Sequence, residues 1–124
     1  MYNNVLGRAE TYIAGEDLSA AQYLFVTDDG DEVTVTGAGL AATGVLFNAP
    51  VEDDAATVVR GGDPNVWVGT GGVTVGDIVA SDANGAAVVA TTGDIALGKA
   101  RATAAAGGLV QIQFFGQGQY EVPA

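Results

Sequence analysis

The sequence contains neither cysteine nor histidine, and these absences remove most of the usual side-chain chemistry. Without cysteine there can be no disulfide framework and no thiolate nucleophile. Without histidine the commonest general base and metal ligand is missing. Serine occurs only as Ser19 and Ser81, and neither lies in the G-x-S-x-G context of a hydrolase nucleophile. We therefore expect no catalytic residues and a protein that is not an enzyme.

Positive charge is also scarce, with 4 Lys and Arg against 15 Asp and Glu and a net charge of -11. Such a charge repels nucleic acid and anionic membranes, so we expect neither as a partner. No run approaches the roughly 20 apolar residues of a membrane span, and the first residues lack a signal-peptide pattern. We expect synthesis and assembly in the cytoplasm. The acidity is also typical of proteins from salty habitats, a hypothesis that loss of the fold below molar salt would support.

Large aliphatic side chains are few, and Ala and Val supply most of the apolar residues. At ~25 cal/mol per Å² of buried apolar surface, a buried Ala contributes far less than a buried Leu or Phe. A chain of 124 residues has the size of one domain, and this composition predicts only moderate stability for the monomer. Packing against copies of itself or against a partner would add the missing buried surface.

What the sequence does have is 19 Gly and 3 Pro that separate short runs rich in Val, Thr, Phe and Tyr. This spacing is typical of many short antiparallel strands. Asp29-Gly30 and Asn84-Gly85 each favour a hairpin, since the pair can take positive φ at both central positions. The predicted fold is all-β, a small antiparallel β-barrel or sandwich of about ten short strands with an extended N-terminal arm. No internal repeat stands out. We expect strands near residues 9–13, 22–27, 32–36, 43–48, 55–60, 65–68, 78–81, 86–90, 96–103 and 109–115.

The expected organisation is an N-terminal arm (1–18), a β-barrel or sandwich domain (19–116) and a C-terminal tail (117–124). Residues 1–18 are polar with scattered Tyr and Ile, a pattern that indicates an extended arm that becomes ordered on contact with a partner.

Two patterns resemble ligand sites and fail the physical test for them. Residues 37–42 fit G-x-G-x-x-A, but another strand follows where a dinucleotide site needs a helix N-terminus. Acidic residues around Gly30 and at 52–54 could ligate calcium, but their spacing does not match an EF-hand loop. We favour a glycine-rich connection and solvated turns, and expect no cofactor and no metal.

The order of motifs from about residue 15 to residue 115 resembles the phage capsid cement proteins, also called head decoration proteins. The resemblance implies no catalytic residues. It implies a small β unit that binds the outer surface of a tailed-virus head and stabilises contacts between major capsid protein subunits, often as a trimer. The chain departs from typical members in its acidity, its single Lys and its last nine residues. The likeness lies in residues 18–26, 41–46, 55–60, 76–85, 93–100 and 108–112.

We expect the arm to contact a neighbouring chain, through Tyr2, Leu6, Tyr12 and Ile13 above all. Trp67, the single Trp, is expected to pack in the core or at a partner interface.

A different class of function stays open. The chain could be a carbohydrate-binding or adhesive β module on a virion surface. That function needs an exposed aromatic platform, for which Trp67 with Tyr23 or Tyr120 is the candidate set.

Overall fold

The computed structural model describes residues 8–123, and over that range the protein is all-β, as predicted. The described residues form twelve short strands and one 3-10 turn, and no α-helix. The strands are two to six residues long, and most of them are followed within two residues by Gly or Asp, which favour turns. The strands are β1 (Ala9–Ala14), β2 (Phe25–Asp29), β3 (Glu32–Val35), β4 (Gly44–Leu46), β5 (Ala55–Val59), β6 (Asn65–Trp67), β7 (Ile78–Ser81), β8 (Ala87–Val89), β9 (Ile95–Ala96), β10 (Gly98–Ala100), β11 (Leu109–Phe114) and β12 (Tyr120–Glu121).

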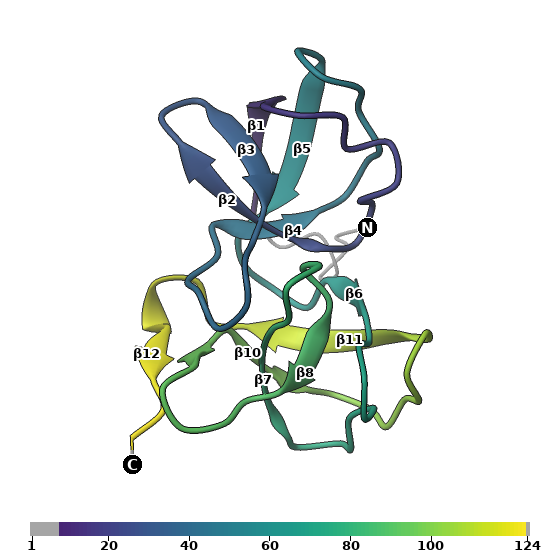
Figure 1. The fold of residues 1–124 in the computed structure, drawn as a ribbon, viewed down its shortest axis with the longest axis vertical. Helices are drawn as coiled ribbons and strands as arrows, with labels where there is room; N and C mark the ends of the chain where they lie inside the picture. The colour runs from purple at the N-terminus through teal and green to yellow at the C-terminus, as the bar shows by residue number, and fades with distance from the viewer. Residues whose placement is uncertain (1–7, 124) are drawn as a thin grey trace.

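The first five strands close into a barrel in the order β1-β3-β2-β4-β5, the upper unit in Figure 1. β1 pairs antiparallel with β5 and parallel with β3, so it closes the barrel. Residues 9–14 and Leu18 of the predicted arm therefore belong to this barrel, and Leu18 is fully buried. The barrel interior is a core of small and medium side chains, Ala14, Leu18, Ala21, Val26, Val33, Leu46, Ala56 and Val58.

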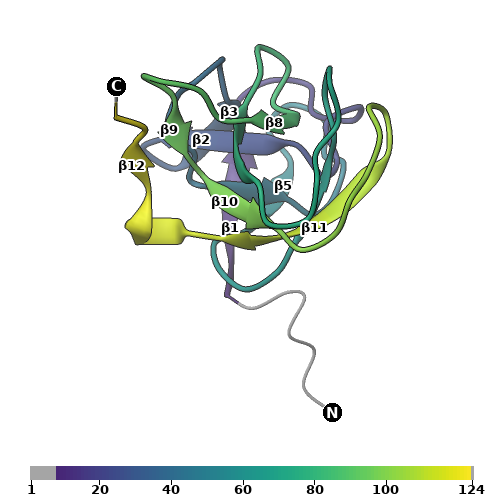
Figure 2. The same ribbon diagram turned by 90° about the horizontal axis from the view of Figure 1, so that it is seen from below.

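The next strands form an antiparallel sheet in the order β6-β11-β10-β7-β8, the lower unit in Figure 1. Its two edges come together, because a parallel bridge joins Val68 to Ala87 and the Gly69 N–H donates to the Ala87 carbonyl (2.8 Å). The sheet is thus almost a second barrel. β9 and β12 pair with each other at one margin of the molecule, as Figure 2 shows.

The two units have the same topology, so the chain contains an internal structural repeat. Residues 9–60 (repeat 1) correspond to residues 63–114 (repeat 2), with β1, β2, β3, β4 and β5 matching β6, β7, β8, β10 and β11. The registers agree at an offset of 54 residues: Ile13 faces Ala55 in repeat 1, and Trp67 faces Leu109 in repeat 2. The parallel pair Ala14–Val33 likewise recurs as Val68–Ala87. β7 is offset by 53 instead, because the β7–β8 turn is one residue longer than the β2–β3 turn.

A crowded glycine recurs at the same place in both repeats. Gly44 in β4 and Gly98 in β10 each lie against the neighbouring strand so closely that a Cβ would collide with a backbone carbonyl. The colliding carbonyls belong to Val59 and Gln113, which are themselves equivalent positions. Each barrel therefore requires glycine where two strands make their closest approach.

Left-handed backbone recurs as well, although the residue types differ. Tyr23 has φ 69° and corresponds to Gly76 with φ 91°, while Asp53 (φ 74°) corresponds to Gly107 (φ 85°). Tyr23 N–H donates to the Leu46 carbonyl as Gly76 N–H does to the Ala100 carbonyl. Since a non-glycine residue rarely takes this conformation, the shared backbone path imposes it on Tyr23 and Asp53.

The repeats share one core across their junction. Phe25, Ala42 and Val45 of repeat 1 are buried among the apolar side chains of repeat 2, and Phe25 lies 6.4 Å from the Phe114 ring. The Phe25 N–H also donates to the Gly85 carbonyl (2.8 Å). Repeat 2 therefore depends on repeat 1 for part of its interior.

Three local expectations are corrected. The strand expected from residue 22 begins at Phe25, because Tyr23 is left-handed. The strand expected over 96–103 divides into β9 and β10 and ends at Ala100. At Asn84-Gly85, as at Asp29-Gly30, only the glycine has positive φ. In the first of these turns the Asp82 carboxylate organises a longer turn by accepting the Asn84 and Ala86 N–H groups.

Candidate interaction surfaces

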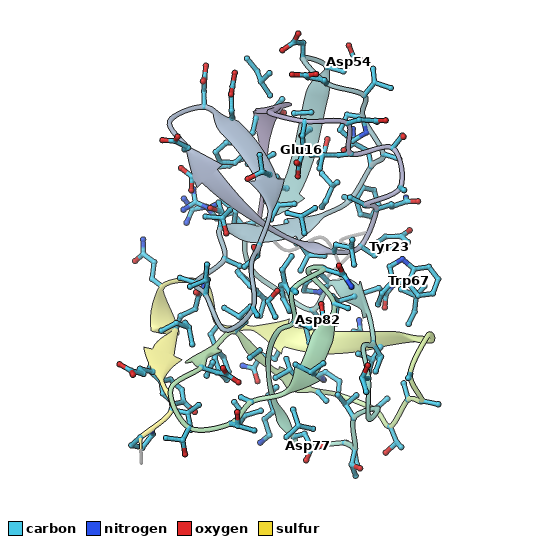
Figure 3. All side chains as sticks on the ribbon, in the orientation of Figure 1. Glu16, Tyr23, Asp54, Trp67, Asp77 and Asp82 are labelled. Carbon is cyan, nitrogen blue, oxygen red and sulfur yellow. The ribbon has the colours of Figure 1, made fainter. Side chains whose placement is uncertain are left out.

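Seven of the 15 Asp and Glu residues gather at the end of repeat 1 that lies away from repeat 2, where Figure 3 places Asp54. The β2–β3 turn and the β4–β5 loop meet there, because the Ile13 and Ala14 N–H groups donate to the Asp31 and Asp54 carbonyls. Within residues 8–123, no three acidic side chains converge as a metal site. The arrangement is a solvated acidic surface. Its members are Asp28, Asp29, Asp31, Glu32, Glu52, Asp53 and Asp54.

Two of the four basic residues lie together on repeat 2. Lys99 in β10 and Arg101 just after it border an open hollow of about 360 Å³, with Val75 and Gln113 on its other sides. Arg101 forms a partly exposed ion pair with Asp63 (3.4 Å). An exposed pair of this kind contributes little to stability, so both cations can engage a partner.

The other two basic residues flank Glu10 on β1. Arg60 Nη1 lies 2.7 Å from Glu10 Oε1, Arg8 Nη2 lies 3.2 Å from Oε2, and the Tyr12 hydroxyl donates to Oε1 (3.3 Å). The hydrogen bond from Arg60, opposed by partial burial and aided by Arg8, lowers the pKa of Glu10 below its ordinary value. Partial burial raises the pKa of Tyr12. This cluster ties β1 to β5 beside a polar hollow of about 270 Å³.

Replacing Glu10 by Gln should make stability less dependent on pH. A carboxylate whose folded pKa is lowered stabilises the fold fully above its ordinary value near 4.5 and loses that effect as pH falls through the lowered value. The melting temperature of wild type should exceed that of Glu10→Gln most at neutral pH, and the gap should close in acid. Thermal melts from pH 3 to pH 7 measure it. Glu52→Gln on the exposed loop is the control, and a gap independent of pH would contradict the assignment.

An exposed aromatic patch lies where the two repeats meet. The backbone N–H of Trp67 donates to the backbone carbonyl of Tyr23 (3.1 Å). Figure 3 shows both side chains pointing outward on the same side. Phe47 packs edge-on against Tyr23 at 6.3 Å, and Leu109 lies beside Trp67 on the neighbouring strand. Phe47, Trp67 and Leu109 are 39%, 38% and 40% exposed. Exposed aromatic side chains grouped in this way are characteristic of binding surfaces.

The predicted interface residues fall in three places. Tyr2 and Leu6 lie outside the described residues. Tyr12 is half-buried on the barrel, and Ile13 is 37% exposed at the acidic end. Trp67 occupies the position in repeat 2 that Ile13 occupies in repeat 1.

Phe47 and Leu109 were not expected from the sequence as members of this patch. Trp67–Leu109 pairing depends on the β6–β11 register, which no local pattern reveals. Tyr120, the other candidate for an aromatic platform, stacks on Phe115 at 6.1 Å in a different part of the molecule, on β12 (Figure 1). The platform expected from Trp67 and Tyr23 is present as an exposed patch, and Tyr120 is not part of it.

No described helix is long and apolar enough to cross a membrane. No protein-family profile matches the chain, and no curated protein matches it. Among solved structures, the chain is similar to the head fiber gp8.5 N base of bacteriophage phi29, with a TM-score of 0.71 and 19% sequence identity. The alignment covers 86% of this chain and 92% of that one. The protein therefore shares its fold with a base domain of a phage head fiber.

Proposed function

We propose that this protein is a non-enzymatic structural protein of a tailed-virus head that binds the outer capsid surface. The observation that carries the proposal is the likeness over most of both chains to the phi29 head fiber base. The chain composition agrees, since it offers neither thiol nor imidazole chemistry. The proposed partner is the major capsid protein, and the proposed role is that of a decoration or cement protein, acting as a trimer, that holds neighbouring capsid subunits together.

The exposed side chains support a role in packing against protein. The patch of Tyr23, Phe47 and Trp67 has the aromatic character of interface hot spots, where few residues supply most of the binding energy. We propose that Trp67 contacts the capsid. We also propose that Tyr2 and Leu6 near the N-terminus, together with Tyr12 and Ile13 on β1, contact a neighbouring chain. Several weak contacts made at once would raise the effective affinity on the shell.

Co-sedimentation with expanded heads that lack the protein tests this function. Trp67→Ala should weaken binding by roughly tenfold to a hundredfold, the range of a hot-spot truncation. Leu40→Ala, which truncates a side chain 58% exposed outside the patch, is the matched control and should bind as wild type.

Deletion of residues 1–7 tests the arm. It leaves every described strand intact, whereas deletion of residues 1–14 would remove β1 from the barrel. Undiminished capsid occupancy by both Trp67→Ala and the deletion would contradict the assigned contacts. A gene neighbourhood with head protease and major capsid genes would support the assignment independently.

A carbohydrate-binding role is the second candidate, and the aromatic patch favours it, since sugars stack on exposed rings. Selective binding on a glycan array that Trp67→Ala abolishes would support it over capsid binding. An array without hits would remove it.

A further inference from the structure

The two repeats contact each other through different surfaces. Repeat 1 contributes Phe25, Val45 and the Tyr23 carbonyl, a surface that we name the receiving face. Repeat 2 contributes the Ser81–Gly85 turn and Trp67, and we name this second surface the docking face. A contact of this kind is heterologous, so it leaves one face of each type unused in every chain.

The unused receiving face belongs to repeat 2. Lys99, Arg101 and Gln113 occupy the positions of Val45, Phe47 and Val59 in repeat 1. In repeat 1 Val45 and Val59 are covered, each only 1% exposed, while Phe47 at the margin is 39% exposed. In repeat 2 the same surface borders the open hollow of about 360 Å³. Every chain therefore carries a vacant copy of a surface that it uses internally.

The unused docking face belongs to repeat 1. The β2–β3 turn, with Asp28, Asp29 and Asp31, corresponds to the Ser81–Gly85 turn of repeat 2, and Ile13 corresponds to Trp67. These side chains are exposed. The unused docking face of repeat 1 combines acidic side chains with the apolar Ile13. The vacant receiving face of repeat 2 carries the basic residues Lys99 and Arg101. The two unused faces are thus complementary in charge.

We propose that a second copy of this chain places the docking face of its repeat 1 on the receiving face of repeat 2, continuing the contact made within each chain. The occupant is the same protein because its faces already fit each other in the junction between the repeats. This proposal specifies the self-association included in the proposed function. Repetition of one heterologous contact gives a closed ring where the rotation between copies closes.

The contact between chains should be weaker than the contact within one. The internal junction buries Val45, and Lys99 would occupy the equivalent position in the contact between chains. The contact between chains would therefore have ion pairs in place of buried apolar side chains. Attraction between partly exposed charges is screened by salt, so association should fall as ionic strength rises. A reversible contact would keep free copies separate in solution until they are concentrated.

Sedimentation velocity of the full chain at high concentration, in about 30 mM and about 1 M salt, tests the contact. Wild type should associate at low salt and dissociate at high salt. Lys99→Glu with Arg101→Glu should weaken association at least tenfold, and so should Asp29→Lys with Asp31→Lys. A chain carrying all four substitutions should associate again. Glu52→Lys with Asp54→Lys, the same charge change on the other acidic loop, should associate as wild type.

A second test mixes the Lys99→Glu, Arg101→Glu variant with the Asp29→Lys, Asp31→Lys variant, and it does not need the quadruple variant. Each retains one intact face, so the mixture should form a heterodimer although each variant alone is monomeric. A monomeric wild type, a mixture that stays monomeric, or equal loss in the Glu52 and Asp54 control would overturn the contact. Those results would leave capsid binding standing, because co-sedimentation measures it separately.

Discussion

Phe25→Ala should lower the free energy of unfolding by about 3–5 kcal/mol, the usual cost of removing a fully buried Phe side chain. Phe25 is 0% exposed and comes from repeat 1, yet it packs in the core of repeat 2 against Phe114. The loss should therefore destabilise both repeats together. Because small domains are stable by only about 5–15 kcal/mol, this one change removes a large part of the total.

Urea denaturation followed by two probes measures the effect. Trp67 fluorescence reports on repeat 2 at the junction, while circular dichroism reports on all strands. The two probes should give coincident transitions in wild type and in the variant, with the variant shifted to lower urea. Leu40→Ala, at an exposed position, should stay within about 0.5 kcal/mol of wild type. Two separated transitions in wild type would show that the repeats fold independently, against the shared core.

Gly44→Ala and Gly98→Ala should each destabilise the fold by about 3 kcal/mol or more, at the upper end of the cost of overpacking. A Cβ on Gly98 would lie 2.6 Å from the Gln113 carbonyl oxygen, and a Cβ on Gly44 would meet the Val59 carbonyl more closely still. Both obstacles are backbone atoms of a paired strand, which cannot move aside without breaking the ladder.

Gly61→Ala is the matched control for the glycine pair. A Cβ at Gly61 has its nearest neighbour at 3.8 Å, and the residue has no positive φ. Its effect should be within about 0.5 kcal/mol, or slightly stabilising through the unfolded state. Thermal or urea melts of the three variants decide the matter. Equal stability of Gly44→Ala, Gly98→Ala and Gly61→Ala would contradict the close approach and its repetition.

The sequence reveals the strands better than their partners. Alternation at Val33 and Val35, and at Val110, Ile112 and Phe114, predicts strands that the structure confirms within a residue or two. Those patterns are local, set by which side chains face the core. The expectation of about ten short strands in an all-β fold is confirmed, with twelve present among the described residues.

The internal repeat could not be seen in the sequence, because backbone geometry recurs where side chains do not. Gly44 and Gly98 match since a carbonyl demands it, but Val45 corresponds to Lys99. Tyr23 corresponds to Gly76, two residues with nothing in common except a left-handed backbone. Val45 is buried whereas Lys99 borders an open hollow, so these equivalent positions carry unlike side chains.

The candidate surface was predictable only in part. Trp67 and Tyr23 could be singled out as rare aromatic residues in a chain of small side chains. Their contact depends on the junction between the repeats, where the Trp67 N–H meets the Tyr23 carbonyl. The contacts assigned to Tyr2, Leu6, Tyr12, Ile13 and Trp67 stay predictions until a complex is examined.

Cryo-electron microscopy of virus heads assembled with this protein, compared with heads assembled without it, is the decisive experiment for the proposed function. Additional density is expected on the outer shell, across boundaries between major capsid subunits, and the two-barrel chain should fit into it. Identical outer surfaces in the two preparations, or a location inside the head, would contradict it.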